Sequence, residues 1–246
     1  MQNAARLTYG YPIRGNKMQN DNKKGRNTEK IVGISVFSAL AFVVALVCNV
    51  IPPVAGFLSL DIKDSLIAIA AFSYGSVSAV IISLIAAVLE LLTFSTTGWY
   101  GFVMNFVSSS AFSLTASFIY SKFRSINGAV VGIYSAVAVT TGTMLLMNVL
   151  VTPWYLVYIG VPEAAAHGQV AELLPKVLLP FNFAKTLLNG ATLMMIYKPV
   201  TLAMSRIGIG AKKKSVTKWG RKTVFIMTVG GVSLLAAMAI LLLLWL

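Results

Sequence analysis

The stretch LLPFNFAKTLLNGATLMMIYKP, residues 178–199, is long and apolar enough to cross a bilayer, yet it carries two amides and a lysine. A membrane-spanning helix needs about 20 predominantly apolar residues. Asn182, Lys185 and Asn189 follow an i, i+3, i+7 spacing, so on a helix they share one face. Because a lysine in the bilayer core costs at least about 2.5 kcal/mol, this face is expected to meet a cavity or a charged partner.

The composition of the whole chain indicates a membrane protein. Of 246 residues, 57% are hydrophobic and only 11% are charged, and the mean hydropathy is +0.81. Several uncharged apolar runs approach or exceed the length that crosses a bilayer. We therefore expect an all-α fold, a polytopic membrane helical bundle with a six-helix core and a seventh helix at the C-terminal end.

The apolar runs predict where the helices lie. The first covers about residues 31–51 and ends at Pro52-Pro53, which cannot continue a helix. The second ends near Tyr74, and a long connector is expected between the fifth and sixth helices, at 152–175. The remaining helices are predicted at 77–94, 101–120, 129–151, 176–204 and 224–246. The organisation is then a basic tail (1–30), a six-helix domain (31–206), a basic linker (207–223) and an extra transmembrane helix (224–246).

The positive charge is distributed as a membrane topology requires. The net charge is +13, and seven of the 20 basic residues precede residue 31, while eight lie between Lys198 and Lys222. Together with Lys122 and Arg124, these fall on one side of the membrane in the predicted helix count. Basic loops face the cytoplasm, so we expect a multi-pass protein of the cell membrane with a cytoplasmic N-terminus. The charge is explained by topology and lipid contact, and no nucleic-acid partner is expected.

Polar residues from five helices are predicted to meet in the outer half of the membrane. Asn105, Asn148, Asn182 and Lys185 lie near the outer ends of their helices, as the helical rise of about 1.5 Å per residue places them. Asp61, Asp64 and Glu90 are the candidate partners for Lys185. The alternative is that single amides and hydroxyls only join helices, at about 0.6–2 kcal/mol each. For Lys185 with amides on its face, a binding site is favoured.

The loops beside these residues are aromatic. Their rings would either form the interfacial belt common in membrane proteins or wall a pocket for a flat ligand; they are Trp99, Tyr100, Trp154, Tyr155 and Tyr158. An outward pocket with amides, one cation and aromatic walls suits an uncharged, planar molecule rich in hydrogen-bonding groups.

No motif for chemistry accompanies this pocket. The segment GIGAKKKS lacks the spacing of a phosphate-binding loop. One cysteine and one histidine give no metal ligand set, and no nucleophile motif is present. We expect no enzyme activity, no ATPase activity of the chain itself, and no metal or cofactor.

Four segments carry a resemblance to a known family. They are LDIKD (60–64), STTGWYGFVMN (95–105), MNVLVTPWY (147–155) and LLPFNFAKTLLN (178–189). In this order, within residues 31–206, the sequence resembles the riboflavin-specific S components of energy-coupling factor (ECF) transporters. The resemblance implies a substrate-capture subunit that binds riboflavin as its transported ligand. It also implies two kinds of partner, a transmembrane coupling protein and two cytoplasmic ATPases.

The resemblance also assigns roles to residues. It implies that substrate is bound by Asp61, Lys63, Thr96, Gly98, Asn105, Asn148, Tyr155, Asn182 and Lys185. It implies that the loop between the first two helices gates the pocket, and that Ala41 and Ala45 form a small-residue strip for the coupling protein. Ordinary packing inside the chain explains this strip equally well. The seventh helix, 224–246, departs from the family pattern.

Other functions fit parts of the sequence. One is an S component for a different vitamin. Another is an ion-coupled carrier that uses Lys185, Glu90 and the two aspartates as a relay. A membrane-embedded enzyme is disfavoured by the missing motifs.

Overall fold

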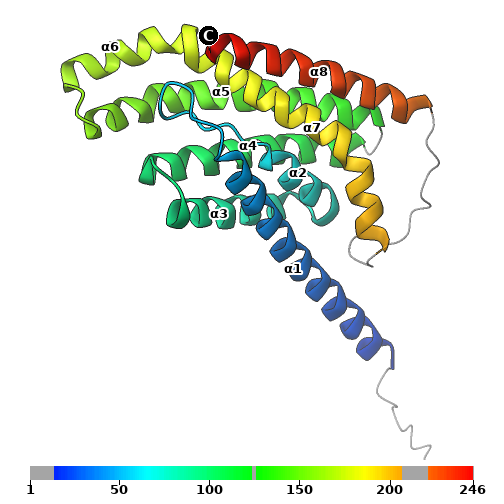
Figure 1. Ribbon diagram of the computed structural model, residues 1–246. Coiled ribbons are helices and arrows are strands. Elements are labelled where there is room, and N and C mark those ends of the chain that lie inside the picture. Colours follow the sequence, from blue (N-terminus) through cyan, green and yellow to red (C-terminus); the bar gives the residue numbers. More distant parts are fainter. Residues whose placement is uncertain (1–13, 124–125, 207–220, 246) are drawn as a thin grey trace, which may run out of the picture.

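The computed structural model describes residues 14–123, 126–206 and 221–245, and these residues form a bundle of helices (Figure 1). The elements are α1 (Arg14–Cys48), α2 (Lys63–Tyr74), α3 (Ser76–Thr93), α4 (Gly98–Phe123), α5 (Ile126–Tyr158), α6 (Glu163–Leu173), the π-helical turn η1 (Leu174–Leu178), α7 (Leu179–Arg206) and α8 (Arg221–Trp245). In α1, α3, α4, α5 and α8, the described residues include stretches long and apolar enough to cross a membrane. The predicted all-α membrane bundle is confirmed.

Helix α1 begins far earlier than the apolar run suggested. It starts at Arg14, so that much of the expected basic tail is helical. Residues 14–30 contain no proline, and extending an existing helix costs far less than nucleating one. At about 1.5 Å per residue, the helix is long enough to leave the bundle, and its first turns extend away from the other helices (Figure 1). The predicted linker 207–223 falls largely outside the described residues.

The prediction of one long connector after the fifth helix was wrong. Helix α5 continues through Pro153 to Tyr158, because a proline inside a helix removes one backbone hydrogen bond without necessarily ending it. The chain turns at Gly160, which has a positive φ of 102°. The rest of the expected connector folds as α6 and η1 and leads directly into α7.

Helix α8 packs along α7, and Figure 1 shows the two running side by side. Gly230 allows this approach, since a Cβ at that position would lie 3.1 Å from the Cβ of Met194 and 3.3 Å from the carbonyl oxygen of Ala191. A hydrogen bond of 2.8 Å between the hydroxyls of Tyr134 and Ser233 also joins α8 to α5. The extra C-terminal helix is therefore an integral part of the bundle.

The short helix α2 positions the site. It has 12 residues, about 18 Å, which is shorter than the bilayer core, and residues 67–71 are buried among its neighbours. Its first residues, Lys63 and Asp64, are buried as well. The α1–α2 loop (residues 49–62) must therefore enter the bundle to reach the start of α2. It brings Ser59 and Asp61 against α7.

Candidate functional site

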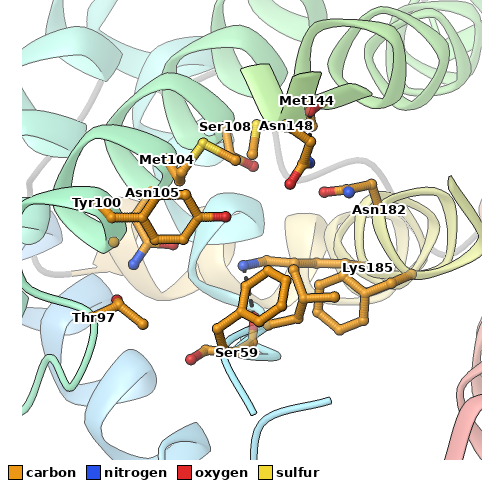
Figure 2. Close-up of a pocket in the computed structure, with 14 residues that line it drawn as sticks. Ser59, Thr97, Tyr100, Met104, Asn105, Ser108, Met144, Asn148, Asn182 and Lys185 are labelled. Atoms are coloured by element: carbon orange, nitrogen blue, oxygen red, sulfur yellow. Dashed lines mark hydrogen bonds between the residues drawn. The ribbon is translucent and has the colours of Figure 1, made fainter. Parts of the chain in front are cut away.

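A small cavity with an open mouth lies between α4, α5, α7 and the α1–α2 loop; the empty space there, counted together with the open solvent at the mouth, is about 470 Å³. Its walls combine three amides and one ammonium group with aromatic and thioether side chains. The lining residues are Phe57, Leu58, Ser59, Thr97, Tyr100, Gly101, Met104, Asn105, Ser108, Met144, Asn148, Phe181, Asn182 and Lys185. Ten of them are labelled in Figure 2.

The α4 wall follows from helical spacing. Gly101, Met104, Asn105 and Ser108 line the cavity, and their i, i+3, i+4, i+7 pattern is one face of a helix. An added Cβ at Gly101 would overlap the side-chain hydroxyl of Thr97, which would have to move. One stripe of α4 thus supplies a small residue, a thioether, an amide and a hydroxyl to the site.

The amides of α5 and α7 keep part of their hydrogen-bonding capacity for the cavity. Asn148 donates to the carbonyl of Met144 (2.7 Å) and accepts from the hydroxyl of Thr152 (2.9 Å). Asn182 donates to the carbonyl of Leu178 (2.7 Å). A carboxamide has two N–H donors and two acceptor sites. Asn148 and Asn182 therefore each keep at least one donor and one acceptor site for a ligand. The two side chains point toward one another across the cavity (Figure 2).

Lys185 is the cation of the cavity wall. Its Nζ lies 2.8 Å from Oδ2 of Asp61 and donates to the carbonyl oxygen of Ser59 at 3.0 Å. An ammonium group has three donors, so a third remains for a ligand. Of the three candidate partners predicted for Lys185, the structure therefore pairs it with Asp61. This ion pair holds the α1–α2 loop against α7.

Behind the wall, the pairing continues as a chain of alternating charges. Asp61 also lies 3.4 Å from Nζ of Lys63, and Lys63 lies 2.7 Å from Oε1 of Glu90. Glu90 in turn accepts a hydrogen bond of 2.8 Å from Nδ2 of Asn105. The loop residue Asp61 is deeply buried, which favours its neutral form, but the ammonium groups of Lys185 and Lys63 hold the pKa of Asp61 down at about 2. Asp61 is therefore an anion at physiological pH.

Asn189, the third polar residue on the α7 face, serves the loop instead of the cavity. Its amide nitrogen donates to the carbonyl of Asp61 (2.9 Å), and its oxygen accepts from the backbone N–H of Ser65 (3.1 Å). Asn189 therefore fixes the end of the α1–α2 loop and the first turn of α2.

Aromatic rings close one side of the site. Tyr100 and Tyr155 stack with their centroids 4.3 Å apart, and Phe57 of the loop contacts both rings, at 6.2 and 5.8 Å. The hydroxyl of Tyr100 pairs with that of Thr152 at 3.1 Å. The other aromatic candidates, Trp99, Trp154 and Tyr158, are 73–85% exposed, which is typical of the interfacial belt.

The structure brings only some of the predicted binding residues to the cavity. Asn105, Asn148, Asn182 and Lys185 line it. The other five do not line it. Asp61 and Lys63 lie behind Lys185, and Tyr155 stacks on the lining residue Tyr100. Gly98 is the first residue of α4, and Thr96 is exposed, whereas its neighbour Thr97 lines the wall. The binding roles themselves remain predictions.

Sequence reasoning missed several lining residues. Met104 and Ser108 could have been found, because they share a helical face with Asn105. The loop residues Phe57, Leu58 and Ser59 carried no such signal.

The small-residue strip of α1 lies inside the chain. Ala41 and Ala45 are 0% and 4% exposed, on a helix that packs against α2 and α3. In this conformation the strip is not accessible to another protein, and its role at a partner interface stays a prediction. The exposed face of α1 carries another pair of small residues four apart, Ser35 and Ala39.

The described residues offer no metal site. Within residues 14–123, 126–206 and 221–245, no group of three or more His, Cys, Asp or Glu side chains could hold a metal ion.

Comparisons with known proteins agree with this architecture. The family model for the substrate-specific component of ECF transporters matches residues 29–201. Riboflavin transporter RibU of Staphylococcus aureus is 28% identical over 74% of this chain and 95% of its own length. Riboflavin transporter FmnP of Bacillus subtilis is 27% identical over 69% and 90%. A solved structure of the S component of a bacterial ECF transporter superposes with a TM-score of 0.60 at 26% identity, covering 73% of this chain and 99% of that one.

Proposed function

Because this chain belongs to the family of substrate-specific components of ECF transporters, we propose that it captures riboflavin for import. The observation that carries the proposal is the cavity with three amides and one ammonium in its wall, in a chain similar to two proteins named riboflavin transporters. Riboflavin has a planar ring system with a polar edge of carbonyl and N–H groups. Such an edge needs several fixed donors and acceptors, which the cavity offers.

The walls suit the parts of the ligand differently. Lys185, Asn148 and Asn182 hold the polar edge of the ring system. Phe181, Met104 and the stacked tyrosine Tyr100 cover its apolar faces, since aromatic and thioether groups pack well on flat rings. The hydroxyls of the sugar-like chain lie toward Ser59 and Thr97. This division gives binding roles to three of the predicted residues, Lys185, Asn148 and Asn182, and supporting roles to Asp61 and Lys63.

The α1–α2 loop gates the cavity in this proposal. Phe57, Leu58 and Ser59 form part of the wall, so the loop must move for a large ligand to enter or leave. Import itself requires energy from outside the chain. A transmembrane coupling protein and two cytoplasmic ATPases supply it, and the N-terminus of this chain faces the cytoplasm.

A fluorescence titration tests the proposal. The full-length chain, purified in detergent, is titrated into riboflavin, whose emission is quenched when the ring stacks on aromatic side chains. We expect saturation at one riboflavin per chain, and no competition by thiamine, a vitamin without the tricyclic ring. Absence of quenching together with thiamine binding would favour an S component for another vitamin. Riboflavin-independent ion flux through the chain in proteoliposomes would favour the ion-coupled carrier.

A further inference from the structure

Glu90 is a buried carboxylate that contacts one residue of the cavity wall, Asn105, without lining the cavity itself. It lies near the end of α3 and is 4% exposed. Its Oε2 accepts from Nδ2 of Asn105 at 2.8 Å and from Nζ of Lys63 at 2.9 Å, and its Oε1 lies 2.7 Å from the same ammonium. Of these residues, only Asn105 lines the cavity.

The contact with Glu90 determines what Asn105 offers to a ligand. An ionised carboxylate only accepts hydrogen bonds, so it must be met by the amide nitrogen of Asn105. The carbonyl oxygen of Asn105 is then turned away from Glu90 and is free to accept from a ligand in the cavity. With a donor in place of the carboxylate, the amide would turn over and present N–H groups instead.

The same carboxylate acts on Lys185 through two intermediates. Lys63 lies between Glu90 and Asp61, and Asp61 lies between Lys63 and Lys185. These four charges sum to zero. The shorter distance, 2.7 Å, joins Lys63 to Glu90, and the longer, 3.4 Å, joins it to Asp61. Without Glu90, Lys63 would be left with Asp61 at 3.4 Å and with the nearby carboxyl of Asp64, and it would compete with Lys185 for Asp61.

We infer that Glu90 is a positioning residue for the proposed flavin pocket. It sets the carbonyl of Asn105 toward the ligand and, through Lys63 and Asp61, keeps Lys185 in place on the opposite wall. The inference rests on the proposed riboflavin-capture function and adds a residue that the ligand does not touch.

The first test is the isosteric variant Glu90→Gln in the full-length chain. The oxygen of the introduced amide pairs with Lys63, so its N–H groups face Asn105 and reverse the amide there. We expect the Kd for riboflavin to rise by about 10- to 100-fold, the range set by losing one or two net hydrogen bonds. A Kd within twofold of the unmodified chain would overturn the inference.

A matched control separates positioning from general stability. Asp64 is also a buried carboxylate, 1% exposed, and it also accepts from an α4 side chain, the hydroxyl of Ser109. Ser109 does not line the cavity. Asp64→Asn should therefore lower the melting temperature of the ligand-free protein while leaving the Kd within about threefold. If both variants weaken binding in proportion to their loss of melting temperature, Glu90 is only structural and the inference fails.

Two double variants give opposite expectations. Glu90→Gln with Asn105→Asp keeps the total charge and keeps an acceptor toward the cavity, so affinity should return to within about fivefold. Glu90→Leu with Lys63→Met removes both members of the ion pair, a change that is often neutral for stability. The amide of Asn105 then has no carboxylate to fix its orientation, so affinity should stay low. If affinity instead stays low in the first double variant and recovers in the second, Glu90 merely neutralises the charge of Lys63. These doubles also serve if Glu90→Gln does not fold, whereas failure of the unmodified chain to bind riboflavin would refute the proposed function instead.

Discussion

Replacing Lys185 with methionine removes the one ammonium of the cavity wall and keeps most of the side-chain volume. In the free protein, Asp61 loses its partner at 2.8 Å but retains Lys63 at 3.4 Å. The loss of stability should then stay below the roughly 3–5 kcal/mol of a fully broken buried pair. In the complex, a hydrogen bond from a charged donor is lost, worth about 1.5–3 kcal/mol. This corresponds to a rise of about 10- to 150-fold in the Kd for riboflavin.

Titration of riboflavin fluorescence measures this change directly. Lys176→Met is the matched control, because Lys176 lies in η1, just before α7, and is exposed. We expect the control to bind like the unmodified chain, with both variants monodisperse by size exclusion. If Lys185→Met binds riboflavin as tightly as Lys176→Met, the ammonium does not contact the ligand and the proposed pose is wrong.

Three further perturbations address the loop, α1 and α8. Phe57→Ala removes ring contacts with Tyr100 and Tyr155, worth about 0.5–1.5 kcal/mol per pair. Loss of both contacts should speed riboflavin dissociation by about 5- to 150-fold in stopped-flow fluorescence, and an unchanged rate would exclude Phe57 from the gate. Ala41→Leu overpacks a fully buried position, so it should cost about 1–3 kcal/mol of stability and weaken riboflavin binding. Ala39→Leu, on the exposed face of α1, should leave binding unchanged. Equal melting temperatures of the two variants would contradict this prediction. Deleting 224–246 should lower the melting temperature and leave the Kd within about threefold; loss of binding would make α8 part of the site.

The helical bundle and part of the cavity could be predicted from sequence because the bilayer constrains both. Long apolar runs have few alternatives to helices in lipid. A lysine with amides on one helical face is costly unless it meets a cavity or partner. Helical spacing and depth therefore predict that Lys185, Asn182, Asn148 and Asn105 lie together, and all four line the cavity.

The order of the charges could not be predicted in the same way. Asp61, Asp64 and Glu90 were equal candidates for Lys185, since each lies near the outer end of a helix. Which one pairs depends on how far the α1–α2 loop enters the bundle, and this follows from the packing of α2. Residue spacing carries no information on that depth. Asp61 and Lys63, to which the family resemblance gives a binding role, lie behind the wall.

The strip on α1 shows a second limit. Small residues four apart allow close packing with any helix, whether from the same chain or from a partner. The sequence therefore could not distinguish Ala41 and Ala45, which are buried, from Ala39 on the exposed face.

The central claim is that riboflavin occupies the cavity between α4, α5, α7 and the α1–α2 loop. A structure of the full-length chain with riboflavin bound measures this most directly. We predict the polar edge of the ring within hydrogen-bonding distance of Nζ of Lys185 and of the amides of Asn148 and Asn182. Riboflavin bound elsewhere, for example between α7 and α8, with this cavity empty and the α1–α2 loop unmoved, would contradict the account.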